Sequence, residues 1–209
     1  MYEIVKEKFN ASDSDVFITL LPGSRISEIN RHFELFKQTI NIVKVTQPNI
    51  KILLPTLPGL QNKLKSLTTD WGLPVHIVTS KEEKYSGFAA SQAALAVSGT
   101  VALELAIACV PMVIAYKANF ITAAIAKRIV KLPQVSLGNI LMESEVCPEY
   151  LQEKATPFNL AYALNNLLDN EVSRSKQIEL WKRIPEKLSA GPDAPSKYAA
   201  KIILDIIEK

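Results

Sequence analysis

Val16-Phe17-Ile18-Thr19-Leu20-Leu21-Pro22-Gly23-Ser24-Arg25 joins an apolar, β-rich run to a turn of small residues that ends in an arginine, and a helical pattern follows. In a parallel α/β sheet such a turn presents backbone N–H groups at a helix N-terminus, where anions bind readily. Gly23 and Ser24 let a ligand approach the backbone, and Arg25 carries a fork of donors that suits phosphate oxygens. The stretch therefore predicts either a phosphate site or an ordinary strand–helix turn with an exposed arginine.

Strands and helices alternate from this stretch up to residue 116. The expected strands cover residues 16–21, 50–55, 75–78, 93–98 and 111–116, and the expected helices cover 27–46 (with Ser27 as N-cap), 61–68, 85–91 and 101–108. Near-continuous apolar strands separated by helices indicate a parallel sheet covered on both faces. We therefore expect an α/β fold with a Rossmann-like parallel sheet of five strands and helices on both faces.

The remainder of the chain is expected to be mostly helical. A lead-in helix is predicted over residues 3–8, and later helices over 121–131, 145–153, 157–169, 171–189 and 196–208. The Gly/Pro-containing segment 190–195 is a turn or linker. These patterns predict a nucleotide-binding domain with a helical extension over residues 1–190 and a separate C-terminal helix over 191–209.

Composition excludes several functional classes. The 209 residues are 48% hydrophobic and 22% charged with a formal charge of +3, which is typical of a globular protein and not of a nucleic-acid binder. No signal peptide or membrane-spanning run is visible, so we expect a cytoplasmic protein. Cys109 and Cys147 fit free thiols. His32 and His76 stand apart from any carboxylate pair, so we expect them to be structural and expect no metal and no cofactor.

A second turn repeats the pattern of the first. Ser98-Gly99-Thr100 lies between an apolar strand and a helix, and Glu104 follows Thr100 by one helical turn. Hydroxyl groups around a glycine at such a turn form a small anion nest, and a nearby carboxylate can accept hydrogen bonds from a sugar diol. Together they predict a nucleotide site; the alternative is a serine N-cap with a solvated glutamate. Ligands of doubly wound sheets bind at the carboxyl ends of the strands, where both turns are expected.

These segments together resemble the C-terminal half of the lipid-A-disaccharide synthase family, glycosyltransferases of the GT-B type. The likeness covers almost the whole chain from residue 16 onward. The matching stretches are 20–25 with Glu28-Ile29, 94–104, 109–113, 126–131, 135–141, Glu149 with Gln152, and Pro195-Ser196.

The resemblance implies both the reaction and the residues that serve it. Such enzymes transfer 2,3-diacylglucosamine from its UDP derivative to 2,3-diacylglucosamine 1-phosphate, forming lipid A disaccharide 1-phosphate and UDP. Their C-terminal Rossmann-like domain holds the UDP donor. The residues implied for UDP are Gly23, Ser24, Arg25, Ser98, Gly99, Thr100 and, for the ribose, Glu104. Arg25 and Asn139 are implied for catalysis, since donors aimed at the charge that grows on the diphosphate lower the barrier.

The chain departs from the family pattern in two places. Full-length enzymes carry an N-terminal half that supplies the acceptor surfaces and an acidic general base. That half is absent here, so we expect UDP binding without turnover unless a separate N-terminal half is supplied. Gly138 stands where the family more often has proline, which is expected to loosen the loop that presents Asn139.

The segment from residue 116 to 131 mixes basic and apolar residues. One interpretation is a peripheral surface at the cytoplasmic face of the inner membrane, where the lipid-linked substrates reside. It would use Lys117, Phe120, Lys127, Arg128 and Lys131. The alternative is an ordinary helix that packs on the sheet. The resemblance further implies a homodimer that exchanges its C-terminal helices.

Two other functional classes stay open. One is a different GT-B-like UDP-sugar enzyme, such as an epimerase or a peptidoglycan glycosyltransferase. The other is a non-catalytic remnant that only binds nucleotide. A nicotinamide dehydrogenase is disfavoured because no Gly-x-Gly-x-x-Gly follows any predicted strand.

Overall fold

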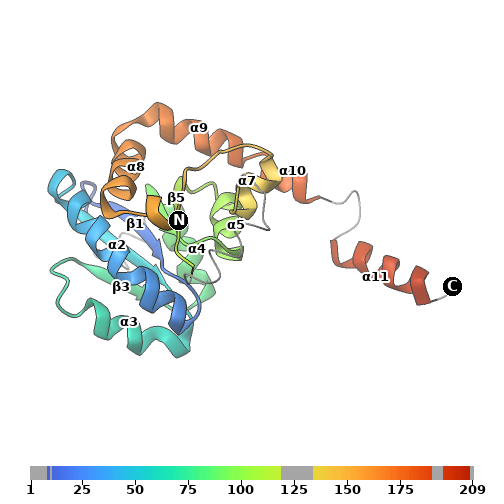
Figure 1. The fold of residues 1–209 in the computed structure, drawn as a ribbon, viewed down its shortest axis with the longest axis horizontal. Coiled ribbons are helices and arrows are strands. Elements are labelled where there is room, and N and C mark those ends of the chain that lie inside the picture. Colours follow the sequence, from blue (N-terminus) through green and yellow to red (C-terminus); the bar gives the residue numbers. More distant parts are fainter. Residues whose placement is uncertain (1–8, 10, 119–133, 190–194, 208–209) are drawn as a thin grey trace.

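A six-stranded parallel sheet forms the centre of the fold in the computed structural model, which describes residue 9 and residues 11–118, 134–189 and 195–207 (Figure 1). The strand order is β3-β2-β1-β4-β5-β6. The strands are β1 (Val16–Leu21), β2 (Ile50–Pro55), β3 (Val75–Val78), β4 (Ala93–Ala96), β5 (Met112–Tyr116) and β6 (Glu149–Leu151). The prediction of a Rossmann-like parallel sheet is confirmed.

Helices cover both faces of this sheet. The helices packed around the sheet are α2 (Ile26–Thr46), α3 (Gln61–Thr68), α4 (Lys81–Ala90), α5 (Thr100–Ile107), α7 (Leu137–Met142), α8 (Pro157–Asp169), α9 (Glu171–Trp181) and α10 (Ile184–Leu188), with 3-10 turns η1 (Pro58–Leu60) and η2 (Gln152–Lys154). A further helix, α11 (Pro195–Ile207), follows them in the chain. Helices α2 and α8 pack together over one face, and α5, α7 and α10 contact one another over the other.

Alternation along the strands divides the buried apolar residues between these two faces, because successive strand side chains point to opposite sides. In β4, Ala93 and Leu95 join the core under α2 and α8, whereas Ala94 and Ala96 join the core under α5. Fully buried strands need apolar residues at every position, which is why these segments read as unbroken apolar runs.

Two of the predicted helices are wrong. Residues 145–153 contain β6 and η2, so the sheet has six strands and not the expected five. Ile114 and Tyr116 pair in parallel with Glu149 and Leu151, and this pairing overrides the local helical pattern. The expected helix 171–189 is divided into α9 and α10; Pro185 lies at the start of α10, where a missing N–H is tolerated. The predicted helices over 3–8 and 121–131 lie outside the described residues.

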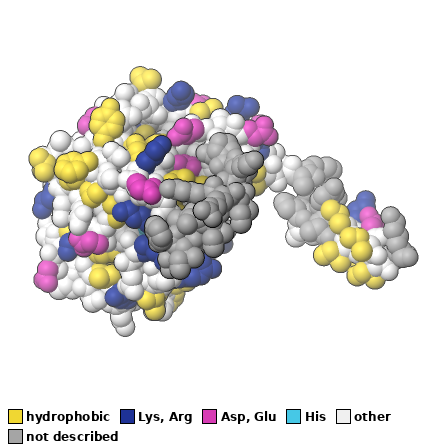
Figure 2. Space-filling model, in the orientation of Figure 1, with side chains coloured by type: hydrophobic (Ala, Val, Ile, Leu, Met, Phe, Trp, Pro, Cys, Tyr) yellow, Lys and Arg dark blue, Asp and Glu magenta, His cyan; other side chains and the backbone are white. Residues whose placement is uncertain are grey.

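The last described helix, α11, lies away from the sheet (Figure 1). Its apolar side chains gather along one side of the helix in Figure 2, and five of them are exposed: Ile202, Ile203, Leu204, Ile206 and Ile207. The predicted division of the chain into a domain over residues 1–190 and a separate C-terminal helix over residues 191–209 stays a prediction.

Two phenylalanines offer a matched test of the packing. Phe36 of α2 is fully buried between helix and sheet, whereas Phe158 of α8 is 76% exposed. We expect Phe36→Ala to lower the free energy of unfolding by about 3–5 kcal/mol, because a large apolar side chain leaves a cavity. Phe158→Ala should change it by less than about 0.5 kcal/mol. Urea denaturation followed by circular dichroism measures both, and equal losses would contradict the described core.

Candidate functional site

The two predicted turns lie side by side at the carboxyl edge of the sheet. Strands β1 and β4 are neighbours, with Leu21 opposite Ala96, and the Val97 N–H donates to the Leu21 carbonyl at 3.0 Å. The sheet extends from β1 toward β3 on one side and from β4 toward β6 on the other. This is the switch point at which doubly wound folds bind ligands.

Glu28 closes the first turn from within. Its Oε2 accepts from the Ser24 N–H at 2.8 Å and from the Arg25 N–H at 3.3 Å, and its Oε1 accepts from Arg25 Nη1 at 3.0 Å. The N-cap of α2 is Arg25, not the expected Ser27, and Glu28 lies at the third helical position, where a glutamate reaches back to the N-cap. The described anion nest therefore already holds a carboxylate.

Gly23 makes this closure sterically feasible. Its φ is +133°, and a Cβ at this position would lie 2.3 Å from the Glu28 Cβ. Partial burial raises the pKa of Glu28, but the hydrogen bonds from Ser24 and Arg25 outweigh it and hold that pKa below its ordinary value. Glu28 is thus ionised at neutral pH, and its charge faces the 77% exposed Arg25 side chain.

The second turn is open by comparison. Gly99 is the N-cap of α5 and gives no side-chain cap, and Thr100 is exposed. The first N–H groups of a helix have no intrahelical partner, so they are available to an anion. Ser98 is occupied otherwise, because its hydroxyl donates to the Val135 carbonyl at 2.8 Å.

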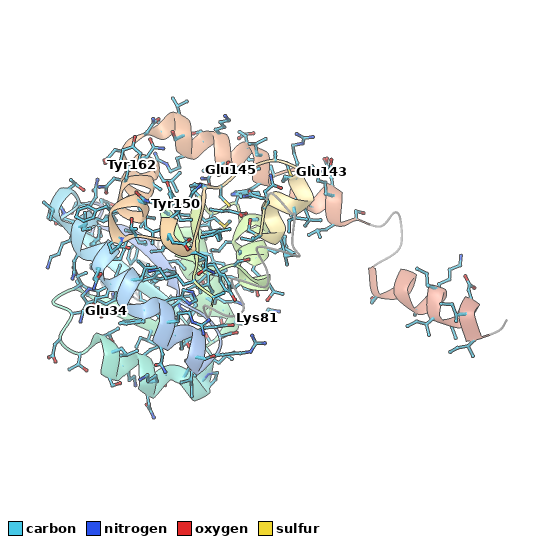
Figure 3. All side chains as sticks on the ribbon, viewed as in Figure 1. Glu34, Lys81, Glu143, Glu145, Tyr150 and Tyr162 are labelled. Atoms are coloured by element: carbon cyan, nitrogen blue, oxygen red, sulfur yellow. The ribbon has the colours of Figure 1, made fainter. Side chains whose placement is uncertain are left out.

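Glu104 is held by two side chains of α4 that sequence reasoning missed. Lys84 Nζ lies 2.5 Å from Glu104 Oε2, and the Tyr85 hydroxyl donates to the same oxygen at 3.0 Å. Lys81, labelled in Figure 3, begins this helix. Glu104 is therefore not the freely solvated side chain of the alternative interpretation. No sequence spacing predicts the pairing, since it depends on how α4 packs beside α5.

Asn139 lies inside the protein and not at its surface. Its Nδ2 donates to the Cys147 carbonyl and to Glu149 Oε1, both at 2.8 Å, and its Oδ1 accepts from the N–H groups of Val146 and Cys147. The side chain has no exposed area. In this arrangement Asn139 braces the loop before β6, and a direct contact with substrate stays a prediction.

Glu149 joins Asn139 to the second turn. Its carboxylate accepts from the N–H groups of Val135 and Ser136 at 2.7 and 2.9 Å and from the Ser136 hydroxyl at 2.7 Å. Because Ser98 donates to the Val135 carbonyl, one continuous chain of hydrogen bonds runs from the second turn to Asn139.

Gly138 lies directly against an indole ring. A Cβ at this position would meet Trp181 ring carbons at 3.0 and 3.1 Å, and Trp181 is fully buried. The absence of a side chain at 138 thus lets Trp181 of α9 pack against α7, so Gly138 lies in a closely packed helix and not in the loose loop that was expected.

His32 ties α2 to the end of β5. Its Nδ1 lies 2.9 Å from the Glu28 carbonyl, and its Nε2 accepts from the Lys117 N–H at 3.0 Å, which requires a neutral ring with the proton on Nδ1. Burial holds the pKa of His32 below its ordinary value. The histidine is structural, as expected from the sequence.

Of the five residues predicted to face a membrane, the structure describes only Lys117, whose backbone carbonyl also accepts from Arg31 at 3.3 Å. Phe120, Lys127, Arg128 and Lys131 lie outside the described residues. Within the described ranges no helix is long and apolar enough to cross a membrane, and no group of three or more potential metal ligands occurs. Both cysteines are free thiols.

Comparison with known sequences gives the family. The lipid-A-disaccharide synthetase family profile matches residues 3–203. The chain belongs to this family. The lipid-A-disaccharide synthase of Nitrobacter winogradskyi is 37% identical over 192 residues, which cover 92% of this chain and 48% of that protein. The enzyme from Rhodopseudomonas palustris strain CGA009 is 38% identical over 201 residues, covering 96% and 51%. The chain spans about half the length of these relatives.

Solved structures show the same fold. WaaG, a glycosyltransferase involved in lipopolysaccharide biosynthesis, superimposes with a TM-score of 0.63 at 16% identity, over 97% of this chain and 50% of that one. The catalytic domain of cholesterol-α-glucosyltransferase from Helicobacter pylori gives 0.55 at 18% identity, over 82% and 99%. The fold is that of a GT-B glycosyltransferase domain.

Substitution of Gly23 tests the closed first turn. We expect Gly23→Ala to lower the free energy of unfolding by about 1–3 kcal/mol, since the φ is unfavourable and the new Cβ overlaps Glu28. Gly59→Ala is the matched control, because a Cβ there meets nothing within 4 Å. Chemical denaturation compares the two; an equal, small effect of both substitutions would show that Glu28 does not lie over the turn.

The histidines predict a dependence of stability on pH. Burial lowers the pKa of both His32 and His76 below 6.5, so the unfolded chain takes up protons before the folded one as pH falls. The stabilisation by the neutral rings is present above pH 6.5 and is lost as pH falls through the folded pKa values, by at most about 1.4 kcal/mol per pH unit for each ring. His32→Gln should reduce this slope between pH 7 and 5, as measured by urea denaturation at a series of pH values. An unchanged slope would contradict the buried, neutral state of His32 and its hydrogen bonds to Glu28 and Lys117.

Proposed function

We propose that this chain is the UDP-binding half of a lipid-A-disaccharide synthase. The reaction transfers 2,3-diacylglucosamine from its UDP derivative to 2,3-diacylglucosamine 1-phosphate and releases UDP. The observation that carries the proposal is the adjacency of the Gly23–Arg25 turn and the Ser98–Thr100 turn across the β1–β4 pair. Membership of the family supports the reaction, and the fold supports a nucleotide-sugar donor.

The two turns have complementary roles in this proposal. The uncapped start of α5 offers N–H groups of Thr100 and its neighbours to the diphosphate. Arg25 reaches the same phosphates from β1, since its guanidinium is largely exposed and only one of its nitrogens contacts Glu28 among the described residues. Glu104, one turn along α5, binds the ribose.

Catalysis follows from the charge on the leaving group. As the glycosidic bond breaks, negative charge grows on the diphosphate while the sugar gains oxocarbenium character. In this proposal Arg25 and the α5 N–H groups donate to that charge, and preorganised donors of this kind are usually the largest catalytic contribution. Asn139 serves this site as a positioning residue, because its hydrogen bonds shape the loop that Ser98 contacts.

The acceptor side of the site is proposed to lie in the region that full-length relatives carry in addition. That half supplies the acceptor and acyl-chain surfaces and an acidic general base. The lipid-linked substrates place the reaction at the cytoplasmic face of the inner membrane, with the region around Lys117 nearest the lipid. The exposed apolar side of α11 supports packing on a second domain or an exchanged position in a homodimer.

UDP titration by calorimetry tests the donor site. We expect Arg25→Ala to weaken UDP binding about 10- to 100-fold, the value of a hydrogen bond to a charged group, and Glu104→Ala about tenfold. Lys65→Ala on α3 removes a charge from an exposed position and should leave the affinity unchanged. NADH should not bind.

Two results would contradict the proposal. Equal UDP affinity of the wild type and both site variants would show that UDP does not bind at these residues. Tight NADH binding would indicate a nicotinamide-nucleotide site instead of a UDP site. Transfer of the glucosamine unit is expected only after an N-terminal half from a relative is added; turnover by the chain alone would show that the general base lies on it.

A further inference from the structure

Two donors converge on a single oxygen of Glu104. Lys84 Nζ and the Tyr85 hydroxyl both contact Oε2, at 2.5 and 3.0 Å. Among the described residues, none is hydrogen-bonded to Oε1. A carboxylate oxygen has about two lone-pair sites, so Oε2 is saturated and Oε1 keeps its full capacity.

The two donors are themselves held in place. Lys84 Nζ lies 4.8 Å from the Tyr85 ring centroid, within range of a cation–π contact. The Tyr85 ring packs edge-on against the buried Phe88, with centroids 5.8 Å apart. The side chains of Lys84 and Glu104 are only 25% and 33% exposed, so the ion pair is largely shielded from water. These contacts fix the orientation of the Glu104 carboxylate before any ligand arrives.

A carboxylate in this state recognises a sugar differently from a free one. A free carboxylate can accept two neighbouring hydroxyl groups, one on each oxygen. With Oε2 saturated, Glu104 offers only Oε1, and two neighbouring hydroxyl groups of a ribose compete for that one oxygen.

We propose that Lys84 and Tyr85 are positioning residues that make Glu104 a one-oxygen acceptor, so that the site distinguishes one ribose hydroxyl from its neighbour. The inference rests on the proposed nucleotide site. Lys84 also balances the charge of Glu104, which keeps a carboxylate compatible with a nearby diphosphate.

Deoxy analogues of the ligand test the inference. UDP, 2′-deoxyuridine diphosphate and 3′-deoxyuridine diphosphate are titrated into the wild type and into K84M, K84R, Y85F and K65M. We expect the wild type to bind one deoxy analogue about tenfold more weakly than UDP and the other within about twofold. For the analogue that binds more weakly, Lys84→Met should reduce the ratio of its Kd to the Kd of UDP to about threefold or less. Tyr85→Phe should reduce this ratio by a smaller factor. Lys65→Met should leave both ratios unchanged.

Lys84→Arg distinguishes a role of Lys84 in orienting the Glu104 carboxylate from a role in merely holding α4 and α5 together. Arginine keeps an ion pair with Glu104, so a merely structural role would be preserved. Its planar fork engages both carboxylate oxygens, which would occupy Oε1. We therefore expect K84R to retain the melting temperature of the wild type and to lose the discrimination between UDP and its deoxy analogue.

Three outcomes would overturn the inference while leaving the nucleotide site intact. They are equal discrimination against both analogues by the wild type, wild-type ratios in folded K84M, and wild-type ratios in K84R. Equal UDP affinity of the wild type and Glu104→Ala alone would also overturn the inference. Failure of the wild type to bind UDP, or equal UDP affinity of the wild type, Arg25→Ala and Glu104→Ala, would instead contradict the proposed function on which the inference rests.

Discussion

The parallel pairing of β1 with β4 is the constraint on which the rest of this structure depends. It brings together two strand–helix turns that are separated by more than seventy residues of sequence, through the backbone hydrogen bonds of the strand pair. Helices α2 and α5 begin at these neighbouring turns and leave toward opposite faces of the sheet. The two helix N-termini therefore meet at one edge, and their partial positive charges add there.

The two N-termini differ in how their donors are used. Glu28 neutralises the first turn and holds Arg25, whereas the second turn has no side-chain cap. A ligand phosphate thus competes with an internal carboxylate at one helix and with water at the other. This difference favours the N-terminus of α5 as the first contact for an anion. Arg25, at the start of α2 on the neighbouring turn, would then bind the same anion.

The sequence predicted those elements that are determined by their own local pattern of apolar and turn residues. Strands β1, β2 and β3 were predictable to the residue because unbroken apolar runs bounded by turn residues leave little ambiguity. Strand β6 was not, since its three residues become a strand only by pairing with β5. The role of Glu28 was missed because the expected N-cap was Ser27, and a glutamate is a capping signal only three residues after the N-cap, which here is Arg25. Lys84 and Tyr85 could not, because their contact with Glu104 exists only after α4 and α5 pack. The burial of Asn139 could not be predicted either, because its partner Glu149 lies in β6, the strand that the sequence pattern did not predict.

The indole of Trp181 lying against Gly138 has a consequence for exchanging parts between relatives. Any side chain at position 138 would enter space that the indole fills, since a Cβ there would lie 3.0 Å from a ring carbon of Trp181. Positions 138 and 181 are separated by more than forty residues, yet sterically they form one unit. A chimaera that introduces a side chain at position 138 of this chain therefore requires the indole at 181 to shift by a few tenths of an ångström or to be replaced by a smaller side chain.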